Sequence, residues 1–143
     1  MPRGNIKMTY YLCYGAPLLD RSLDRRINTM RLEGQGRLDG WKMTFTREGH
    51  QPNLAQSAGA KVWGALFLIE EPKLAELDLE EAGGTRVNGT VYFEGEQVPA
   101  VWYTYPTKAT GVPSKEDVEA YVSLYVQAGL PKAQIDGALA VKA

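Results

Sequence analysis

The longest apolar run of the sequence is Val62-Trp63-Gly64-Ala65-Leu66-Phe67-Leu68-Ile69. A continuous apolar run of this length, without polar alternation, is typical of a strand that is covered on both faces. A membrane-spanning helix would need about 20 such residues. We therefore interpret residues 61–69 as a central buried strand and expect no membrane segment.

The segments before this strand alternate between strands and one helix. The predicted ranges are 9–14 (strand), 18–30 (helix), 38–46 (strand) and 53–56 (strand). Leu19, Leu23 and Ile27 are spaced by four, which places them on one face of the predicted helix. Ser57-Ala58-Gly59 is a turn-like stretch and is expected to close the strand at 53–56.

The segments after the central strand predict helices and one hairpin. A short helix starts at Glu71-Pro72, where the missing N–H of proline costs nothing. The remaining predicted ranges are 85–93 and 98–105 (the two strands of a hairpin), 115–128 (helix) and 131–139 (helix). Ser114 suits the N-cap of the longer helix, and Gly129 suits its C-terminal end.

Strands dominate this pattern, and short helices lie between them and at the end. We predict an α+β fold in which a mixed, strongly curled, barrel-like sheet surrounds a cavity. Pro99 cannot donate a hydrogen bond within a sheet, so we expect an edge position or a bulge there. Residues 1–143 are expected to form one domain, with residues 1–8 as a flexible N-terminus.

Charge and rare residues argue against several classes of function. Lys and Arg number 16 and Asp and Glu number 17, for a net charge of −1, so we expect no nucleic-acid or membrane-surface partner. Cys13 is the single cysteine and cannot form an internal disulfide, which favours a cytoplasmic location. Cys13 is interpreted as a small core residue, and His50, the single histidine, as part of a surface loop. We therefore expect no metal site and no Ser–His–Asp triad.

The first candidate site is Tyr14-Gly15-Ala16-Pro17-Leu18, which joins the first predicted strand to the first predicted helix. A glycine turn that enters a helix presents several backbone N–H groups together, and the helix dipole there favours an anion such as a carboxylate. An ordinary strand–helix turn has the same pattern. The residues alone leave both interpretations open.

The second candidate site is the acidic stretch Leu77-Asp78-Leu79-Glu80-Glu81-Ala82-Gly83. A carboxylate that faces an apolar cavity has a raised pKa and can act as an acid and a base near neutral pH. The alternative is a solvated acidic end of a helix.

The register of this stretch favours Glu81 as the inward-facing carboxylate. Leu77 marks the buried side of the short helix, and Leu79 is expected to continue that packing. Asp78 and Glu80 are then left to face solvent or to cap backbone groups. Glu81 precedes small residues that allow the backbone to approach a cavity closely.

Five stretches occur in an order that is typical of one protein family. They are Tyr10–Leu18, Gly36-Arg37-Leu38 with Met43-Thr44-Phe45, Pro52–Gly59, Val62-Trp63-Gly64-Ala65, and Leu77–Ala82. In order, they resemble the Tyr-Phe-x-Tyr-Gly-Ser-Asn-Leu, Ala-Arg-Leu with Leu-x-Phe, Ala-Asn-Ile-x-Pro-Ser-Pro-Gly, Val-Trp-Gly-Val and Leu-Asp-x-x-Glu-Gly segments of the γ-glutamylcyclotransferase family, also called AIG2-like or BtrG-like. The resemblance covers residues 9 to about 105.

The resemblance implies a reaction and a role for each matching residue. The catalytic glutamate of the family falls on Glu81, and its substrate loop falls on residues 14–18, whose amides would hold the α-carboxylate of a γ-glutamyl group. The glutamate takes a proton from the α-amine, which attacks the γ-carbonyl, so that 5-oxoproline forms and the amine or amino acid leaves. The implied partner is a small γ-glutamyl or carboxylate-bearing ligand, and a homodimer remains open.

The sequence also departs from the family pattern. Ala16-Pro17 stands where the family has Ser-Asn, which removes a hydroxyl, an amide side chain and one backbone N–H. Gly84-Thr85-Arg86 stands where the family tends to have a tyrosine. These changes concern the substrate more than the fold.

Two alternatives to an enzyme follow from the same residues. One is a non-catalytic module that binds a small carboxylate in the same site, which Ala16-Pro17 favours. The other is a structural or interaction domain whose cavity is filled by Trp63, Trp102, Tyr103 and Tyr105. A shared fold does not by itself decide between them.

Overall fold

The computed structural model describes residues 7–14, 31–46, 52–80, 84–105 and 113–139. These ranges hold five strands, three α-helices and one short 3-10 helix. In chain order the elements are β1 (Met8–Cys13), β2 (Arg31–Phe45), β3 (Pro52–Glu70), η2 (Glu71–Lys73), α2 (Leu74–Glu80), β4 (Thr85–Phe93), β5 (Glu96–Thr104), α3 (Lys115–Ala128) and α4 (Ala133–Leu139). The helix predicted over residues 18–30 lies outside the described ranges.

The five strands close into a barrel in the order β1-β3-β2-β4-β5. β3 pairs antiparallel with both β1 and β2, and β4 and β5 form an antiparallel hairpin. A short parallel pairing of β1 with β5, Tyr10 with Ala100 and Tyr11 with Val101, closes the sheet. The prediction of an α+β fold with a mixed, barrel-like sheet is confirmed.

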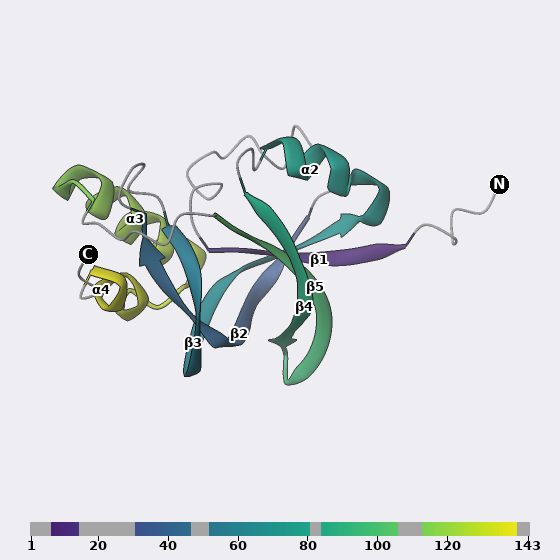
Figure 1. Ribbon diagram of the computed structural model, residues 1–143, viewed down its shortest axis with the longest axis horizontal. Helices are drawn as coiled ribbons and strands as arrows, with labels where there is room; N and C mark the ends of the chain where they lie inside the picture. The colour runs from purple at the N-terminus through teal and green to yellow at the C-terminus, as the bar shows by residue number, and fades with distance from the viewer. Residues whose placement is uncertain (1–6, 15–30, 47–51, 81–83, 106–112, 140–143) are drawn as a thin grey trace.

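β3 is a single strand where the sequence predicted two. The predicted break at residues 57–59 is a bend, because β2 stays paired with β3 on both sides of it. The pairing shifts register between Asp39 and Trp41, and Gly40 (φ 86°) and Gly59 (φ 80°) adopt the left-handed conformation that glycine tolerates. Figure 1 shows the result. The last residues of β2, 41–45, and the first residues of β3, 52–56, form an arm that reaches α3 and α4.

The longest apolar run, Val62–Ile69, lies within β3. None of residues 62–69 is exposed, which agrees with the predicted covered strand. Pro99 pairs with Thr90 of β4, while pairing with β1 starts one residue later, at Ala100. Pro99 is therefore paired with a strand on one side, that of β4. This agrees with the prediction of an edge position for a residue that cannot donate a backbone hydrogen bond.

The ends of α3 follow the predicted capping residues. The hydroxyl of Ser114 accepts a hydrogen bond from the backbone N–H of Asp117 at 3.1 Å. At the other end, Gly129 adopts a left-handed conformation (φ 74°) and its N–H returns to the carbonyls of the last turn. In Figure 1, α3 and α4 lie together beside the β2–β3 arm, whereas α2 lies on another side of the barrel.

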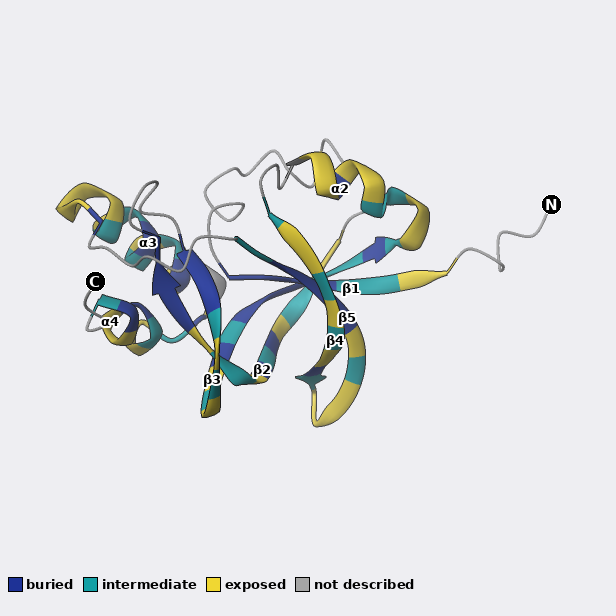
Figure 2. Ribbon diagram, viewed as in Figure 1, coloured by how far each residue is buried: buried dark blue, intermediate teal, exposed yellow. Residues whose placement is uncertain are grey.

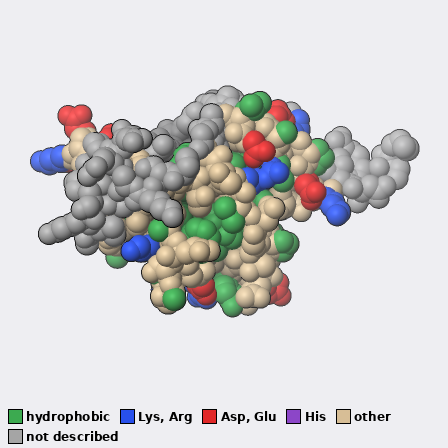
Figure 3. All heavy atoms as spheres, viewed as in Figure 1, with side chains coloured by type: hydrophobic (Ala, Val, Ile, Leu, Met, Phe, Trp, Pro, Cys, Tyr) green, Lys and Arg blue, Asp and Glu red, His purple; other side chains and the backbone are tan. Residues whose placement is uncertain are grey.

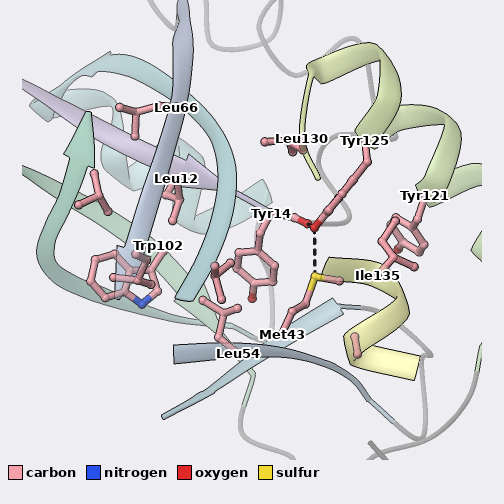
Figure 4. Close-up of a cluster of buried hydrophobic side chains, with 14 of the residues drawn as sticks. Leu12, Tyr14, Met43, Leu54, Leu66, Trp102, Tyr121, Tyr125, Leu130 and Ile135 are labelled. Atoms are coloured by element: carbon pink, nitrogen blue, oxygen red, sulfur yellow. Dashed lines mark hydrogen bonds between the residues drawn. The ribbon is translucent and has the colours of Figure 1, made fainter. Parts of the chain in front are cut away.

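The main hydrophobic cluster fills the barrel and continues beneath α3 and α4 (Figures 2 and 4). Its members include one residue from each strand: Leu12, Leu38, Leu66, Val91 and Trp102. A second cluster lies beneath α2, where buried Leu77 packs with Tyr11, Ile69 and Tyr103. The helices are thus attached to the barrel through two separate sets of buried side chains.

Gly89 of β4 leaves the space that the indole ring of Trp102 occupies. A Cβ atom at residue 89 would overlap that ring, which is buried in the main cluster. We expect Gly89→Ala to lower the free energy of unfolding by about 1–3 kcal/mol, because the core is overpacked. Urea unfolding followed by circular dichroism measures this change.

Gly137→Ala in α4 is the matched control. In the part of the chain that the structure describes, no other side chain or strand lies within 4 Å of the position of its Cβ. Alanine also favours a helix over glycine, so stability should stay the same or rise by about 0.5–1 kcal/mol. Equal unfolding midpoints for Gly89→Ala and the wild type would show that Trp102 does not need this space.

Candidate functional site

The structure describes one of the predicted site residues, Tyr14. Gly15, Ala16, Pro17, Leu18 and Glu81 lie outside the described ranges. The structure describes the end of β1, from which the first predicted segment continues. It also describes α2, whose last residue, Glu80, directly precedes Glu81. The arrangement of these two ends is the basis of the candidate site.

Tyr14 is held by hydrogen bonds on both its side chain and its backbone. It directly follows β1 and is buried. Its hydroxyl donates to the backbone carbonyl oxygen of Tyr103 at 2.6 Å. Its own carbonyl oxygen accepts from the hydroxyl of Tyr125 at 2.6 Å. The end of β1 is therefore tied to β5 and to α3.

Tyr103 links the end of β1 to α2. While its carbonyl accepts from Tyr14, its hydroxyl donates to Oδ1 of Asp78 at 2.5 Å. A short contact of this kind is typical of a hydroxyl that donates to a carboxylate. One buried tyrosine thus connects Tyr14, the first residue of the first predicted segment, with α2, the helix that contains the start of the second.

Asp78 has a second partner in Arg86 of β4. Nη1 of Arg86 lies 3.1 Å from Oδ2 and 3.3 Å from Oδ1 of the carboxylate. Arg86 is also the cross-strand partner of Tyr103 in the β4–β5 hairpin. Two neighbouring residues of the hairpin therefore hold the same carboxylate, and this fixes the last turn of α2 against the sheet.

The predicted direction of Leu79 is wrong, whereas the expected exposure of Asp78 is confirmed. The side chain of Asp78 is 43% exposed, and it also bonds to Tyr103 and Arg86, which the sequence did not predict. Leu79 was expected to continue the packing of Leu77, but it is 79% exposed. The reason is helix geometry: two residues apart means about 200° around the axis, so Leu79 points away from the side that Leu77 buries.

The parts that Tyr103, Arg86 and Tyr125 play do not follow from the sequence. Tyr103 was interpreted as a residue that fills the cavity, and Arg86 as part of a departure from a family pattern. The alternation of the hairpin strands gives the side on which Tyr103 lies, but its partner on α2 depends on how that helix packs. No sequence signal identifies such a pair in advance.

The other candidate residues lie away from this junction or outside the description. Cys13 is buried in the second hydrophobic cluster, as expected for a small core residue, and His50 lies outside the described ranges. Within the described ranges, no group of three or more His, Cys, Asp and Glu side chains is placed to hold a metal ion. In the same ranges, no helix is long and apolar enough to cross a membrane. On the face seen in Figure 3, acidic and basic side chains are interspersed.

A cavity of about 370 Å³ lies between the β2–β3 arm and α4. Its lining residues are Lys42, Met43, Lys61, Trp63, Pro131, Ala133, Gln134, Gly137 and Ala138. Among the described residues, Tyr14, Tyr103 and Asp78 do not line this cavity. Two of its lining residues, Met43 and Gln134, contact the hydroxyl of Tyr125.

Two buried tyrosines of α3 have raised pKa values. Burial is the main reason that the pKa of Tyr121 rises from 10.0 to about 12, and the Asp117 carboxylate and Cys13 add to the effect. Burial also raises the pKa of Tyr125 above its ordinary value, although a hydrogen bond from Gln134 opposes this in part. Both hydroxyls keep their protons at neutral pH, and that of Tyr125 donates to the carbonyl oxygen of Tyr14.

These raised pKa values predict a loss of stability at alkaline pH. In the unfolded chain a tyrosine loses its proton near pH 10, whereas in the folded chain Tyr121 keeps it until about pH 12. Between these two pH values the unfolded state binds fewer protons than the folded state. The fraction of unfolded protein therefore grows as the pH rises from 10 towards 12. Urea unfolding at pH 8, 10 and 11 should show this decline, and Tyr121→Phe should make it less steep. An equally steep decrease of the free energy of unfolding with pH in Tyr121→Phe and in the wild type would show that Tyr121 does not cause the decline.

The barrel and its helices define a class of proteins with known structures. A solved structure described as gamma-glutamyl cyclotransferase superposes with a TM-score of 0.76 and 20% identity, covering 95% of this chain and 89% of that one. An uncharacterized protein from Homo sapiens, loc79017, superposes with a TM-score of 0.75 and 21% identity, covering 94% and 88%. YkqA from Bacillus subtilis gives 0.71 and 17%, covering 95% and 56%. At these identities the likeness concerns the fold.

The sequence itself shows the family. Residues 11–126 match the family described as gamma-glutamyl cyclotransferase, AIG2-like. Because the match spans most of the chain, the chain belongs to this family. Among curated proteins, none matches the sequence significantly.

Proposed function

We propose that this chain is a cyclotransferase that acts on a γ-glutamyl amine or γ-glutamyl amino acid. The products are 5-oxoproline and the free amine. The observation that carries the proposal is the junction made by Tyr103, whose carbonyl binds Tyr14 and whose hydroxyl binds Asp78. This junction connects the end of β1, where the predicted carboxylate-binding loop begins, with α2, which ends one residue before the predicted catalytic Glu81. The family match supports the same activity.

In the proposed site, the backbone amides of residues 15–18 bind the α-carboxylate of the substrate. Backbone N–H groups at a turn into a helix suit an anion. Pro17 supplies no N–H, so the amides of Gly15, Ala16 and Leu18 carry this role. Tyr14 anchors the start of this loop to β5 and α3 through its two hydrogen bonds.

Glu81 is the proposed acid and base. Its carboxylate takes a proton from the α-amine, and the amine nitrogen then attacks the γ-carbonyl carbon, forming a five-membered ring. As the tetrahedral intermediate collapses, the bond from that carbon to the leaving nitrogen breaks, and Glu81 returns its proton to that nitrogen. The substrate supplies its own nucleophile, held at a high effective concentration, so this reaction requires no cofactor.

The second candidate is a non-catalytic module that binds a small carboxylate. Ala16 and Pro17, which replace the Ser-Asn of the family pattern, favour it because they remove polar groups from the loop. The absence of the family's tyrosine, in whose place Gly84-Thr85-Arg86 stands, favours it as well. Such a module would bind the same carboxylates without converting γ-glutamyl compounds.

Detection of 5-oxoproline separates the two candidates. The purified chain is incubated with a panel of γ-glutamyl amines and γ-glutamyl amino acids, and products are measured by mass spectrometry. The enzyme produces 5-oxoproline and the matching amine in equal amounts. Calorimetric binding of glutamate or 5-oxoproline, together with no turnover of any panel member, would favour the binding module.

A further inference from the structure

We propose that Tyr125 and Gln134, from the two C-terminal helices, position and polarise the backbone peptide group at which the carboxylate-binding loop starts. This inference rests on the proposed function, because it assigns a role within the same site. Gln134 lies beyond residues 11–126, the part of the chain that matches the family. A chain of hydrogen bonds runs from β3 through α4 and α3 to Tyr14.

Gln134 of α4 is bound to the backbone of Trp63 in β3 by both ends of its amide. Its Oε1 accepts from the N–H of Trp63 at 2.6 Å, and its Nε2 donates to the carbonyl oxygen of Trp63 at 2.8 Å. β1 pairs with β3 only as far as Ala65, so the side chain of Gln134 takes the place of a strand along this edge. The N–H of Trp63 can only donate, and this decides which atom of the amide is oxygen.

The orientation of this amide sets the direction of the next hydrogen bond. Nε2 of Gln134 also lies 3.0 Å from the hydroxyl oxygen of Tyr125 and donates to it. The hydroxyl keeps its one proton for a second partner. The candidates are the carbonyl oxygen of Tyr14 at 2.6 Å and the sulfur of Met43 at 3.1 Å, both beside Tyr125 in the cluster of Figure 4. A carbonyl oxygen is the stronger acceptor, so the proton is directed to Tyr14.

The carbonyl of Tyr14 belongs to the peptide group that joins Tyr14 to Gly15. A peptide group is planar, so a hydrogen bond to its oxygen fixes the plane in which its N–H also lies. A bond to the oxygen also polarises the group, which makes its N–H a better donor. In the proposed function this N–H is the first of the amides that bind the substrate carboxylate. Burial raises the pKa of Tyr125, so its hydroxyl remains a donor throughout the working pH range.

Two substitutions break this chain at different points. Tyr125→Phe removes the hydroxyl and leaves the ring. Gln134→Glu places a carboxylate beside Tyr125, which attracts the hydroxyl proton away from Tyr14 and removes the donor to Trp63. We expect each variant to raise the dissociation constant of 5-oxoproline, measured by calorimetry, and KM for the γ-glutamyl substrate by about tenfold, the usual effect of losing one hydrogen bond. We expect a smaller change in kcat, since the bond serves binding of the carboxylate.

Matched controls come from the same helix. Tyr121→Phe removes the hydroxyl of a buried tyrosine one turn away, and this hydroxyl has no hydrogen-bond partner among the described residues. Gln127→Glu makes the same chemical change as Gln134→Glu at an exposed position, where the amide contacts Ser123. Both controls should leave the dissociation constant and KM within about twofold of the wild type. Amide NMR spectra and melting temperatures show whether each variant is folded.

The outcomes separate this inference from the proposed function. A folded Tyr125→Phe protein that has a lower melting temperature but unchanged KM and affinity for 5-oxoproline would show a purely structural role and overturn the inference, while the enzyme assignment stands. A wild type that neither binds 5-oxoproline nor converts any γ-glutamyl compound would overturn the proposed function, and the inference with it. A tenfold loss of affinity in both variants, absent from both controls, supports the inference.

Discussion

Glu81→Gln should lower the rate of 5-oxoproline formation by about 10²–10⁴-fold, the usual effect of removing a general base. Glutamine keeps the size of the side chain and most of its hydrogen-bonding capacity, but it cannot take the proton of the α-amine. The loss should therefore appear in kcat, while the dissociation constant of 5-oxoproline changes little. Steady-state kinetics with the best substrate of the γ-glutamyl panel measures the first quantity, and calorimetry measures the second.

Glu76→Gln is the matched control for this substitution. Glu76 lies on α2, near Glu81 in the sequence, and its partly exposed carboxylate forms an ion pair with Lys73 at 3.2 Å. Exposed ion pairs of this kind contribute little to stability, so activity and melting temperature should remain close to those of the wild type. Full activity in Glu81→Gln would reject Glu81 as the base and direct attention to Asp78, the carboxylate held at the junction.

Tyr103→Phe should lower kcat/KM by about 10–100-fold, although Tyr103 is a positioning residue and not a proposed acid or base. Its hydroxyl holds Asp78 at 2.5 Å, and Asp78 lies three residues before Glu81 on the same stretch of chain. Without this bond the last turn of α2 loses one of its two ties to the β4–β5 hairpin. Displacement of a catalytic group by about 1 Å is enough to cost about 10² in rate.

The stability of Tyr103→Phe should fall less than its activity. Phenylalanine keeps the packing of the buried ring with Tyr11 and Leu77, and the backbone carbonyl that binds Tyr14 is unchanged. We expect the free energy of unfolding to decrease by about 1–2 kcal/mol, measured by urea unfolding. Asp78→Asn, which keeps an acceptor for the hydroxyl, should retain more activity than Tyr103→Phe if positioning is the role.

Tyr92→Phe provides the control on the same hairpin. The hydroxyl of Tyr92 accepts from Gln97 at 2.9 Å on the exposed side, away from α2. Its removal should leave kcat/KM and stability nearly unchanged. If Tyr92→Phe and Tyr103→Phe lose activity equally, the hairpin as a whole is sensitive and the specific role of Tyr103 is rejected.

Much of the fold could be predicted because its signals are local. The apolar run at residues 62–69, the hairpin of residues 85–105 and the capping residues Ser114 and Gly129 each depend on a few neighbours in the chain. The order of the matching stretches in the sequence also indicates the family. The bend within β3 was interpreted as a break, because a glycine at which a strand bends and one at which it ends have the same sequence signal.

The candidate site was less predictable because its links join distant parts of the chain. Tyr14 and Tyr103 are 89 residues apart, and Tyr14 and Tyr125 are 111 apart, yet each pair shares a hydrogen bond. The outward direction of Leu79 follows from helix geometry alone and was available from the sequence. The partners of Asp78 were not, because they depend on which strand residues lie beneath α2.

The sequence by itself determined most of the strands, the ends of α3, the family and the residue types proposed for catalysis, since these follow from periodicity, capping chemistry and ordered motifs. The tertiary structure alone decided that Tyr103 joins the end of β1 to α2, that Arg86 shares Asp78 with it, and that Gln134 and Tyr125 hold the carbonyl of Tyr14. The physical reason is that a hydrogen bond needs a distance of about 3 Å and a defined direction. Only closure of the barrel and docking of the helices set these between residues far apart in the chain.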